Sequence, residues 1–82
     1  DFLFTPRAAR HLKRLPQDIQ RRILEKLSFY SKQTDPLDFA EPLTRSELGQ
    51  YRFRVGDYRV IVDLEGGHLA VLLVGHRRDI YR

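Results

Sequence analysis

The chain has 82 residues, a length that accommodates one domain with a modest core, and we predict a single domain over residues 1–82. It contains no cysteine and no apolar run of about 18 residues, which excludes a disulfide framework, a thiolate metal site and a membrane-spanning helix. The net charge is +4, and arginine supplies most of the positive charge. Because a chain without cysteine suits a reducing compartment, we predict that the protein is cytoplasmic.

Residues 2–32 predict a strand followed by two helices. The apolar run Phe2-Leu3-Phe4 favours a short strand, Thr5 is a good N-cap, and Pro6 suits the first helical turn. The first helix extends to about Leu15, and Pro16 ends it and begins the second. With almost no loop between them, the two helices should form an αα-hairpin. Apolar residues of the second helix recur at helical spacing, at Ile19, Ile23, Leu27 and Tyr30.

Beyond a connector at 33–50, the apolar period changes to two. Three strands are predicted over residues 51–55, 58–65 and 68–75, and two-residue turns that contain glycine separate them. The order of elements predicts an α+β fold with an N-terminal strand, an αα-hairpin and a three-stranded antiparallel meander. In this fold the helices pack on one face of a four-stranded sheet.

Three arginines share one face of the predicted sheet, which we call the arginine face: Arg52, Arg54 and Arg59. A turn at Gly56-Asp57 places Arg54 directly across from Arg59. Like charges so placed cost on the order of 0.2–1 kcal/mol, which an anion between them would offset. The alternative is that both side chains extend into water, where screening removes the repulsion. Because arginine suits bidentate phosphate recognition, we favour a polyanion, and nucleic acid in particular, as the partner.

Apolar residues are expected on the arginine face as well. The second turn pairs Arg59 with Val74 and places Ile61, Leu72 and Val74 on this face. Such side chains are too apolar to remain exposed. We therefore expect the C-terminal tail, a partner chain or a nucleic-acid base to cover them in part.

The tail after the last strand adds polar groups at the same end of the sheet. Arg77 is expected to lie near the two opposed arginines, and His76 offers a group that titrates near neutrality. Tyr81 offers a stacking ring and a hydroxyl. The alternatives are an exposed loop histidine at 76 and an apolar anchor at 81. His11 and His68 are isolated in the sequence, so we predict surface positions for them and no metal site.

Several segments resemble the RelE/ParE superfamily of bacterial and archaeal toxins. The main ones are YRFRVGDYRVI at 51–61 and VGHRRDIY at 74–81. The opening FTPRA at 4–8, which precedes the two helices, and DFAEPL at 38–43 resemble the same superfamily. The resemblance extends over nearly the whole chain and implies a RelE-like fold.

For the RelE branch, the resemblance implies an endoribonuclease that cleaves messenger RNA in the ribosomal A site without a metal or cofactor. The ribose 2′-OH attacks the adjacent phosphate and leaves a 2′,3′-cyclic phosphate and a free 5′-OH. Arg59 and Arg77 would bind the scissile phosphate, and Tyr81 would stack on a base. The residues that the resemblance marks as catalytic are Arg52, Arg54, Arg59, Arg77 and Tyr81.

Two further roles are the transfer of the 2′-OH proton and additional contacts with RNA. Arginine stays protonated, so the proton acceptor is left open, and His76 is our candidate to assist. The predicted RNA-binding set comprises the basic residues of the strands and of the tail, namely Arg52, Arg54, Arg59, Arg77, Arg78 and Arg82.

Two alternatives remain open. A ParE-like toxin would inhibit DNA gyrase by binding it, and a degenerate member would bind only its partner and nucleic acid. ParE-like chains generally lack the arginine and tyrosine of the tail, so Arg77 and Tyr81 favour the RelE-like function, with the 70S ribosome and messenger RNA as partners. All three imply an acidic, partly disordered antitoxin. Its expected contacts are the basic helical hairpin and the patch of Ile61, Leu72 and Val74.

Overall fold

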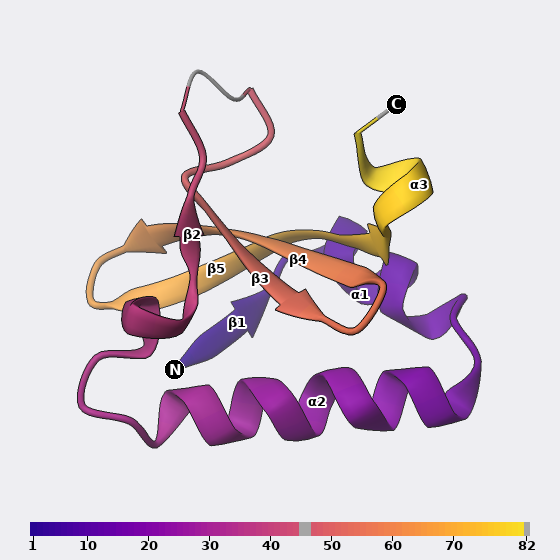
Figure 1. Cartoon of the computed structure of the whole chain (residues 1–82), viewed down its shortest axis with the longest axis horizontal. Helices are drawn as coiled ribbons and strands as arrows, with labels where there is room; N and C mark the ends of the chain where they lie inside the picture. The colour runs from indigo at the N-terminus through magenta and orange to yellow at the C-terminus, as the bar shows by residue number, and fades with distance from the viewer. Residues whose placement is uncertain (45–46, 82) are drawn as a thin grey trace.

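The first part of the chain forms one strand and two helices in the predicted order (Figure 1). The computed structural model describes residues 1–44 and 47–81. Strand β1 spans Phe2–Phe4, α1 spans Pro6–Lys13 and α2 spans Gln17–Ser31. The backbone N–H of Ala8 donates a 3.1 Å hydrogen bond to Thr5 Oγ1, so Thr5 caps α1 as predicted.

Within the described residues the sheet has five strands, one more than predicted. The meander consists of β3 (Tyr51–Val55), β4 (Tyr58–Glu65) and β5 (His68–His76), close to the predicted bounds. The additional strand, β2 (Glu41–Pro42), pairs antiparallel with β3. The strand order is β1-β5-β4-β3-β2, with β1 parallel to β5, and the α+β class is confirmed.

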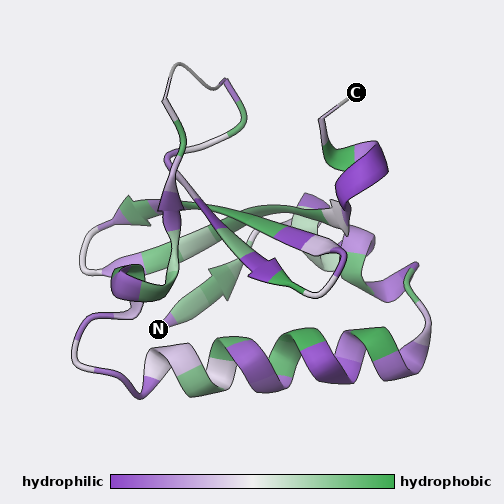
Figure 2. Cartoon of the chain, in the orientation of Figure 1, coloured by the Kyte–Doolittle hydropathy of each residue, from purple (hydrophilic) through white to green (hydrophobic). Residues whose placement is uncertain are grey.

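The helices α1 and α2 cover one face of the sheet (Figure 1). The described residues also form two short helices. The 3₁₀ helix η1 spans Pro36–Phe39 and precedes β2, whereas α3 spans Arg77–Ile80 and follows β5. Figure 2 shows that apolar and polar residues alternate along α2, as expected for an amphipathic helix. Its buried residues are Ile23, Leu27 and Tyr30, whereas Leu24 and Phe29 are exposed. None of the helices in residues 1–44 and 47–81 has the length and apolarity needed to cross a membrane.

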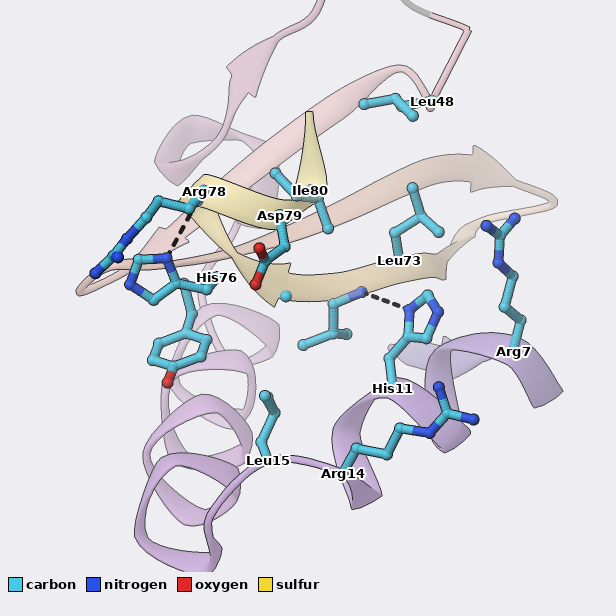
Figure 3. A pocket seen from close by; sticks show the side chains of 13 residues that line it. Arg7, His11, Arg14, Leu15, Leu48, Leu73, His76, Arg78, Asp79 and Ile80 are labelled. Atoms are coloured by element: carbon cyan, nitrogen blue, oxygen red, sulfur yellow. Dashed lines mark hydrogen bonds between the residues drawn. The ribbon is translucent and has the colours of Figure 1, made fainter. Parts of the chain in front are cut away.

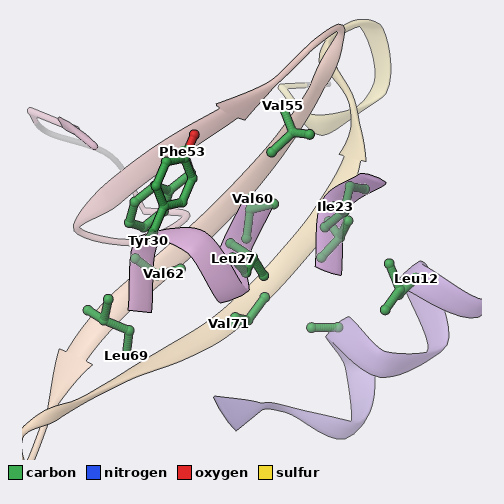
Figure 4. Close-up of a cluster of buried hydrophobic side chains, with 12 residues drawn as sticks. Leu12, Ile23, Leu27, Tyr30, Phe53, Val55, Val60, Val62, Leu69 and Val71 are labelled. Carbon is green, nitrogen blue, oxygen red and sulfur yellow. The ribbon is translucent and has the colours of Figure 1, made fainter. Parts of the chain in front are cut away.

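The core lies between α2 and the sheet (Figure 4). Ile23 and Leu27 of α2 are buried there, as the helical spacing predicted. Tyr30 stacks on Phe53, with ring centroids 5.0 Å apart and an angle of 23° between the planes. The α2 residues thus pack on the period-two residues of β3, which explains why both patterns are present in the sequence.

A β-bulge changes the register between β4 and β5. The pairing of β3 with β4 is as predicted, but an irregularity at Ile61/Val62 leaves Leu72 without a partner in β4. As a result Arg59 lies opposite Gly75, and the predicted pairing with Val74 is wrong. A bulge of one residue reverses the side on which every following side chain lies.

The bulge moves two side chains to faces that we did not predict. Val74 pairs with Val60 and belongs to the core, where it is 4% exposed. Leu73 pairs with Ile61 on the arginine face. The expectation that Val74 lies on the arginine face is therefore wrong.

Gly49 of the connector covers the apolar part of the arginine face. A Cβ at Gly49 would lie 2.6 Å from Ile61 Cγ2 and 3.1 Å from Leu72 Cδ1, so only glycine allows this approach. Ile61 is fully buried as a result. The prediction that Ile61, Leu72 and Val74 form an accessible patch for an antitoxin is thus wrong, because Ile61 and Val74 are both buried within the chain.

Candidate functional site

Glu41 of β2 lies between two residues of the arginine face. Its Oε2 is 3.1 Å from Nη2 of Arg52, and its Oε1 is 2.6 Å from Nε of Arg54. The register of β2 and β3 produces this contact, because Glu41 pairs directly with Arg52. An anion does lie among the arginines, but it is a carboxylate of the chain itself and it bridges a different pair from the one predicted.

These contacts shift the pKa values of both partners. The hydrogen bond from Arg52 holds the pKa of the Glu41 carboxyl below its ordinary value, and the charges of Arg52 and Arg54 act in the same direction. The hydrogen bond with Tyr81 raises the pKa of Arg52, and Glu41 raises it further. Glu41 is therefore ionised and Arg52 is protonated throughout the neutral pH range.

Tyr81, near the C-terminal end, joins Glu41, Arg52 and Arg54 in one cluster of side chains. Nη1 of Arg52 donates a 2.8 Å hydrogen bond to the Tyr81 hydroxyl, and the guanidinium carbon lies 5.8 Å from the ring centroid. The Tyr81 side chain is 47% exposed, so its ring is accessible for stacking. A cation and an aromatic ring thus meet at one point of the arginine face.

Arg59 is directed away from this cluster. It lies across from Arg54, as predicted, but it is only 8% exposed. Its Nη1 donates hydrogen bonds of 2.9 Å to the carbonyl oxygens of Gly56 and Tyr58. Its charge therefore stabilises the β3–β4 turn, and the structure does not bring it together with Arg52.

The two arginines that begin α3 point to different places. The backbone N–H of Arg77 donates to the carbonyl oxygen of Asp57 at 2.8 Å, and Arg77 Nε lies 3.7 Å from Asp57 Oδ1. This contact places Arg77 at the β3–β4 turn, the end of the sheet at which we predicted it. Arg78 lines a pocket beside α3, and Arg82 lies outside the described residues.

His76 lies on the face of the sheet opposite the arginines. It pairs with Tyr58, and the two rings meet edge to face with centroids 5.3 Å apart. Its Nδ1 accepts a 3.1 Å hydrogen bond from the backbone N–H of Arg78. The structure therefore does not bring His76 together with Arg52 and Tyr81.

A cavity of about 730 Å³ opens between α1, the end of β5 and α3 (Figure 3). Arg7 of α1, Arg14 at the C-cap of α1 and Arg78 of α3 line it, together with Asp79 and apolar residues such as Leu15 and Ile80. The guanidinium groups of these arginines form no ion pair with any residue that the structure describes. The cavity is thus a second, mainly cationic site, and it shares Leu73 with the arginine face.

His11 lines this cavity and is partly exposed, so it lies at the surface as predicted, but it is not isolated in the structure. Its Nδ1 accepts a 3.4 Å hydrogen bond from the backbone N–H of Val74 (Figure 3). Val74 lies in the part of β5 that has no pairing with β1. Burial lowers the pKa of His11, and the charges of Arg7, Arg14 and Arg10 lower it further. Within the described residues, no three His, Asp or Glu side chains are grouped to hold a metal ion.

Known proteins match nearly the whole chain. A family model for the ParE toxin of the type II toxin–antitoxin system, parDE, matches residues 2–81. The toxin RelG of Mycobacterium tuberculosis is 36% identical over 81 residues, which cover 96% of this chain and 92% of RelG. The chain belongs to the RelE/ParE family of type II toxin–antitoxin toxins. The toxin RelE of the same organism is 32% identical over 95% of the chain and 81% of that protein.

One chain in each of two solved complexes has the same fold as this toxin. The toxin–antitoxin complex RelBE2 from Mycobacterium tuberculosis matches with a TM-score of 0.77 and 31% identity, covering 93% of this chain and 95% of that one. The RelB–RelE antitoxin–toxin complex from Methanococcus jannaschii matches with a TM-score of 0.75 and 25% identity, covering 96% and 94%. The predicted RelE-like fold is confirmed.

Glu41 and His11 lie in the two clusters described above, but neither was among the predicted site residues. Glu41 belongs to the DFAEPL segment that carried part of the resemblance, but a two-residue strand has no period by which its pairing could be found. For His11 a signal did exist. Arg7, His11 and Arg14 are spaced so that they share one face of α1, and this basic stripe could have marked the cavity.

Proposed function

We propose that the toxin is an endoribonuclease that cleaves messenger RNA in the ribosomal A site, by attack of a ribose 2′-OH on the adjacent phosphate. The observation that carries the proposal is the contact between Arg52 and Tyr81, which unites a cation and a stacking ring from distant parts of the chain. Single-stranded RNA is recognised by such pairs, since its bases stack on aromatic rings and its phosphates bind arginine. The cytoplasm is the location that we propose for this activity.

Arg52 and Arg54 bind the scissile phosphate in this proposal. Their guanidinium groups lie together around one carboxylate, so they can also approach two oxygens of one phosphate. They stabilise the negative charge that develops as the 2′-oxygen bonds to phosphorus. Arg77 extends the cationic surface along the RNA strand, and Tyr81 holds a neighbouring base so that the attacking and leaving oxygens lie in line.

Glu41 accepts the proton of the 2′-OH. Arginine cannot do so, and His76 lies on the other face of the sheet, whereas the ionised Glu41 carboxylate contacts both phosphate-binding arginines. A bound phosphate would neutralise part of the positive charge that lowers the pKa of Glu41. The carboxylate would then become a stronger base at the moment when it is needed, and water would supply the proton of the leaving 5′-oxygen.

Inhibition of DNA gyrase is the second candidate function. The observation in its favour is that the family model matching residues 2–81 is named for ParE. In that function the arginine face would bind a protein, and the proximity of Glu41, Arg52 and Tyr81 would have no catalytic use.

Purified ribosomes loaded with messenger RNA test the proposal. Wild-type toxin should cut the message at the A-site codon, and Arg52→Gln should slow cleavage about 10²-fold, because it removes a group that stabilises the developing charge. Arg21→Gln is the matched control, since Arg21 is exposed on α2 and loses the same charge. Inhibition of gyrase supercoiling with an intact message would contradict the proposal and support the second candidate.

An acidic antitoxin is the protein partner that we propose for the toxin, and the cavity beside α1 is its contact surface. The arginines there favour carboxylates, and the apolar lining favours aliphatic side chains between them. This surface belongs to the basic helical hairpin that we expected the antitoxin to contact.

A further inference from the structure

The short helix α3 carries Arg77 and Tyr81 to their places on the sheet. A four-residue helix is too short to be stable alone, so its contacts with neighbouring elements decide where it lies. The hydrogen bond from Arg77 N–H to the Asp57 carbonyl oxygen holds its first turn against the β3–β4 turn. A Cβ at Gly75 would lie 3.3 Å from Ile80 Cδ1, so the glycine leaves room for α3 to approach β5.

His76 supplies the N-cap of α3. It precedes the first helical residue with an extended backbone, and its Nδ1 accepts the hydrogen bond from the N–H of Arg78 (Figure 3). Ser, Thr, Asp or Asn usually provides this acceptor, which satisfies one of the free N–H groups at a helix start. The edge-to-face contact with Tyr58 holds the imidazole in the orientation that the cap requires.

The cap also determines which nitrogen of His76 carries the proton. Because Nδ1 accepts a hydrogen bond, it is unprotonated, and the neutral ring has its proton on Nε2. The ring then has no free lone pair with which to accept a proton from a ribose hydroxyl. Its position on the face opposite Arg52 leads to the same conclusion.

We propose that His76 is a positioning residue of the toxin, whose Nδ1 caps α3 and thereby holds Tyr81 against Arg52. The consequence for catalysis rests on the proposed function, whereas the cap itself is a property of the fold. Loss of the cap should release the start of α3 and weaken the contact at its other end, where Tyr81 follows Ile80.

Two substitutions separate the cap from acid–base chemistry. Asparagine is a good N-cap residue without a titratable group, whereas alanine cannot cap. On programmed ribosomes His76→Asn should cleave within about threefold of wild type, with an unchanged pH profile of kcat, and His76→Ala should be roughly tenfold slower. His68→Ala, at the start of the same strand, is the matched control and should leave cleavage unchanged.

A double-mutant cycle of His76 and Tyr81 tests whether His76 affects cleavage through Tyr81. If His76 acts through Tyr81, then His76→Ala added to Tyr81→Ala should slow cleavage by less than about twofold further. A full additional tenfold loss in the Tyr81→Ala background would overturn the proposed route.

The hydrogen-exchange rate of the Arg78 amide measures, in the absence of RNA, whether the cap is formed. By NMR this amide should exchange roughly tenfold faster in His76→Ala than in wild type, and at nearly the wild-type rate in His76→Asn. If this pattern is found in a toxin that cleaves no message, the proposed function fails and the cap stands. If exchange is the same in all three proteins, the cap is overturned. If His76→Asn keeps the exchange rate but cleaves as slowly as His76→Ala, His76 is catalytic and the positioning role is overturned.

Discussion

Glu41 bridges Arg52 and Arg54, whereas we expected a ligand phosphate between Arg54 and Arg59. One of its oxygens lies 2.6 Å from Arg54 and the other 3.1 Å from Arg52, in the manner in which two oxygens of a phosphate would bind. The carboxylate therefore has two effects that oppose each other. It neutralises the arginines that should bind RNA, and it offers a base at the point where the 2′-OH would lie.

Replacement of Glu41 by glutamine separates these two effects. If the carboxylate accepts the proton, Glu41→Gln should reduce cleavage on programmed ribosomes by about 10²–10⁴-fold, the usual contribution of a general base. Glu65→Gln, at the exposed end of β4, is the control for loss of one negative charge. Faster cleavage by Glu41→Gln would contradict the base assignment, because it would show that the carboxylate only competes with the phosphate.

Gly49 is a second residue whose identity the structure requires. Gly49→Ala should lower the free energy of unfolding by about 1–3 kcal/mol, since the new methyl group would overlap Ile61 at 2.6 Å. Gly75→Ala is the comparison, because its methyl group would meet the flexible end of Ile80 at 3.3 Å and should cost less than about 1 kcal/mol. Urea titrations measure both, and equal losses would show that Gly49 is not a point of close approach.

At the scale of elements, β5 depends on a side chain where it lacks a neighbouring strand. β1 pairs with β5 only from Leu69 to Val71, so the next part of β5 is an open edge. His11 accepts the hydrogen bond of Val74 N–H at this edge and links α1 to β5. Only an unprotonated Nδ1 can make this link.

Stability should therefore depend on pH through His11. Burial and then the charges of neighbouring arginines lower the pKa of His11 in the folded state, whereas the unfolded chain binds the proton near pH 6.5. The unfolded state thus binds more protons as pH falls below about 6.5, and stability should decrease with falling pH in this range. In urea titrations between pH 7.5 and 5, His11→Gln should flatten this dependence, and His68→Gln should not. An unchanged slope in His11→Gln would show that another group is responsible.

Sequence patterns predicted the elements better than the contacts between elements. Thr5-Pro6 marked the start of α1, and the glycine turns set the bounds of the meander within one residue. The bulge at Leu72 has no signature in a run of apolar residues, so the sides of the two residues that follow it could not be derived. The partner of Arg52 and Arg54 was equally hidden, because Glu41 reaches them from a strand too short to have a period.

At the scale of the molecule, positive charge forms two sites, and α3 or the residue that follows it contributes to both. One is the arginine face, in which a carboxylate already partly neutralises the charge, and the other is the cavity, whose arginines form no ion pair within residues 1–44 and 47–81. The proposed RNA chemistry uses the first site, and the proposed antitoxin uses the second. Because α3 lines the cavity and also precedes Tyr81, a partner bound in the cavity is in contact with the helix that positions the stacking ring.

Charge substitutions in the cavity test the antitoxin surface. The double variant Arg7→Glu/Arg14→Glu should weaken antitoxin binding at least tenfold and reduce its salt dependence, because it removes charges that attract an acidic chain. Calorimetry at two salt concentrations measures both effects. Arg21→Glu/Lys26→Glu on α2 makes the same change in net charge away from the cavity. Equal weakening by both pairs would exclude a specific role for the cavity.

The parallel pairing of β1 with β5 has a consequence for the order of folding. Phe2 pairs with Leu69, near the opposite end of the chain, whereas β3, β4 and β5 are joined by two-residue turns. Closing the long loop costs more entropy than closing a hairpin, so the meander can form first and β1 can join it only late. Conservative substitutions at the β3–β4 pairs should therefore slow refolding, whereas truncation of Phe2 should mainly accelerate unfolding. The strand that begins the sequence is then among the last to enter the sheet.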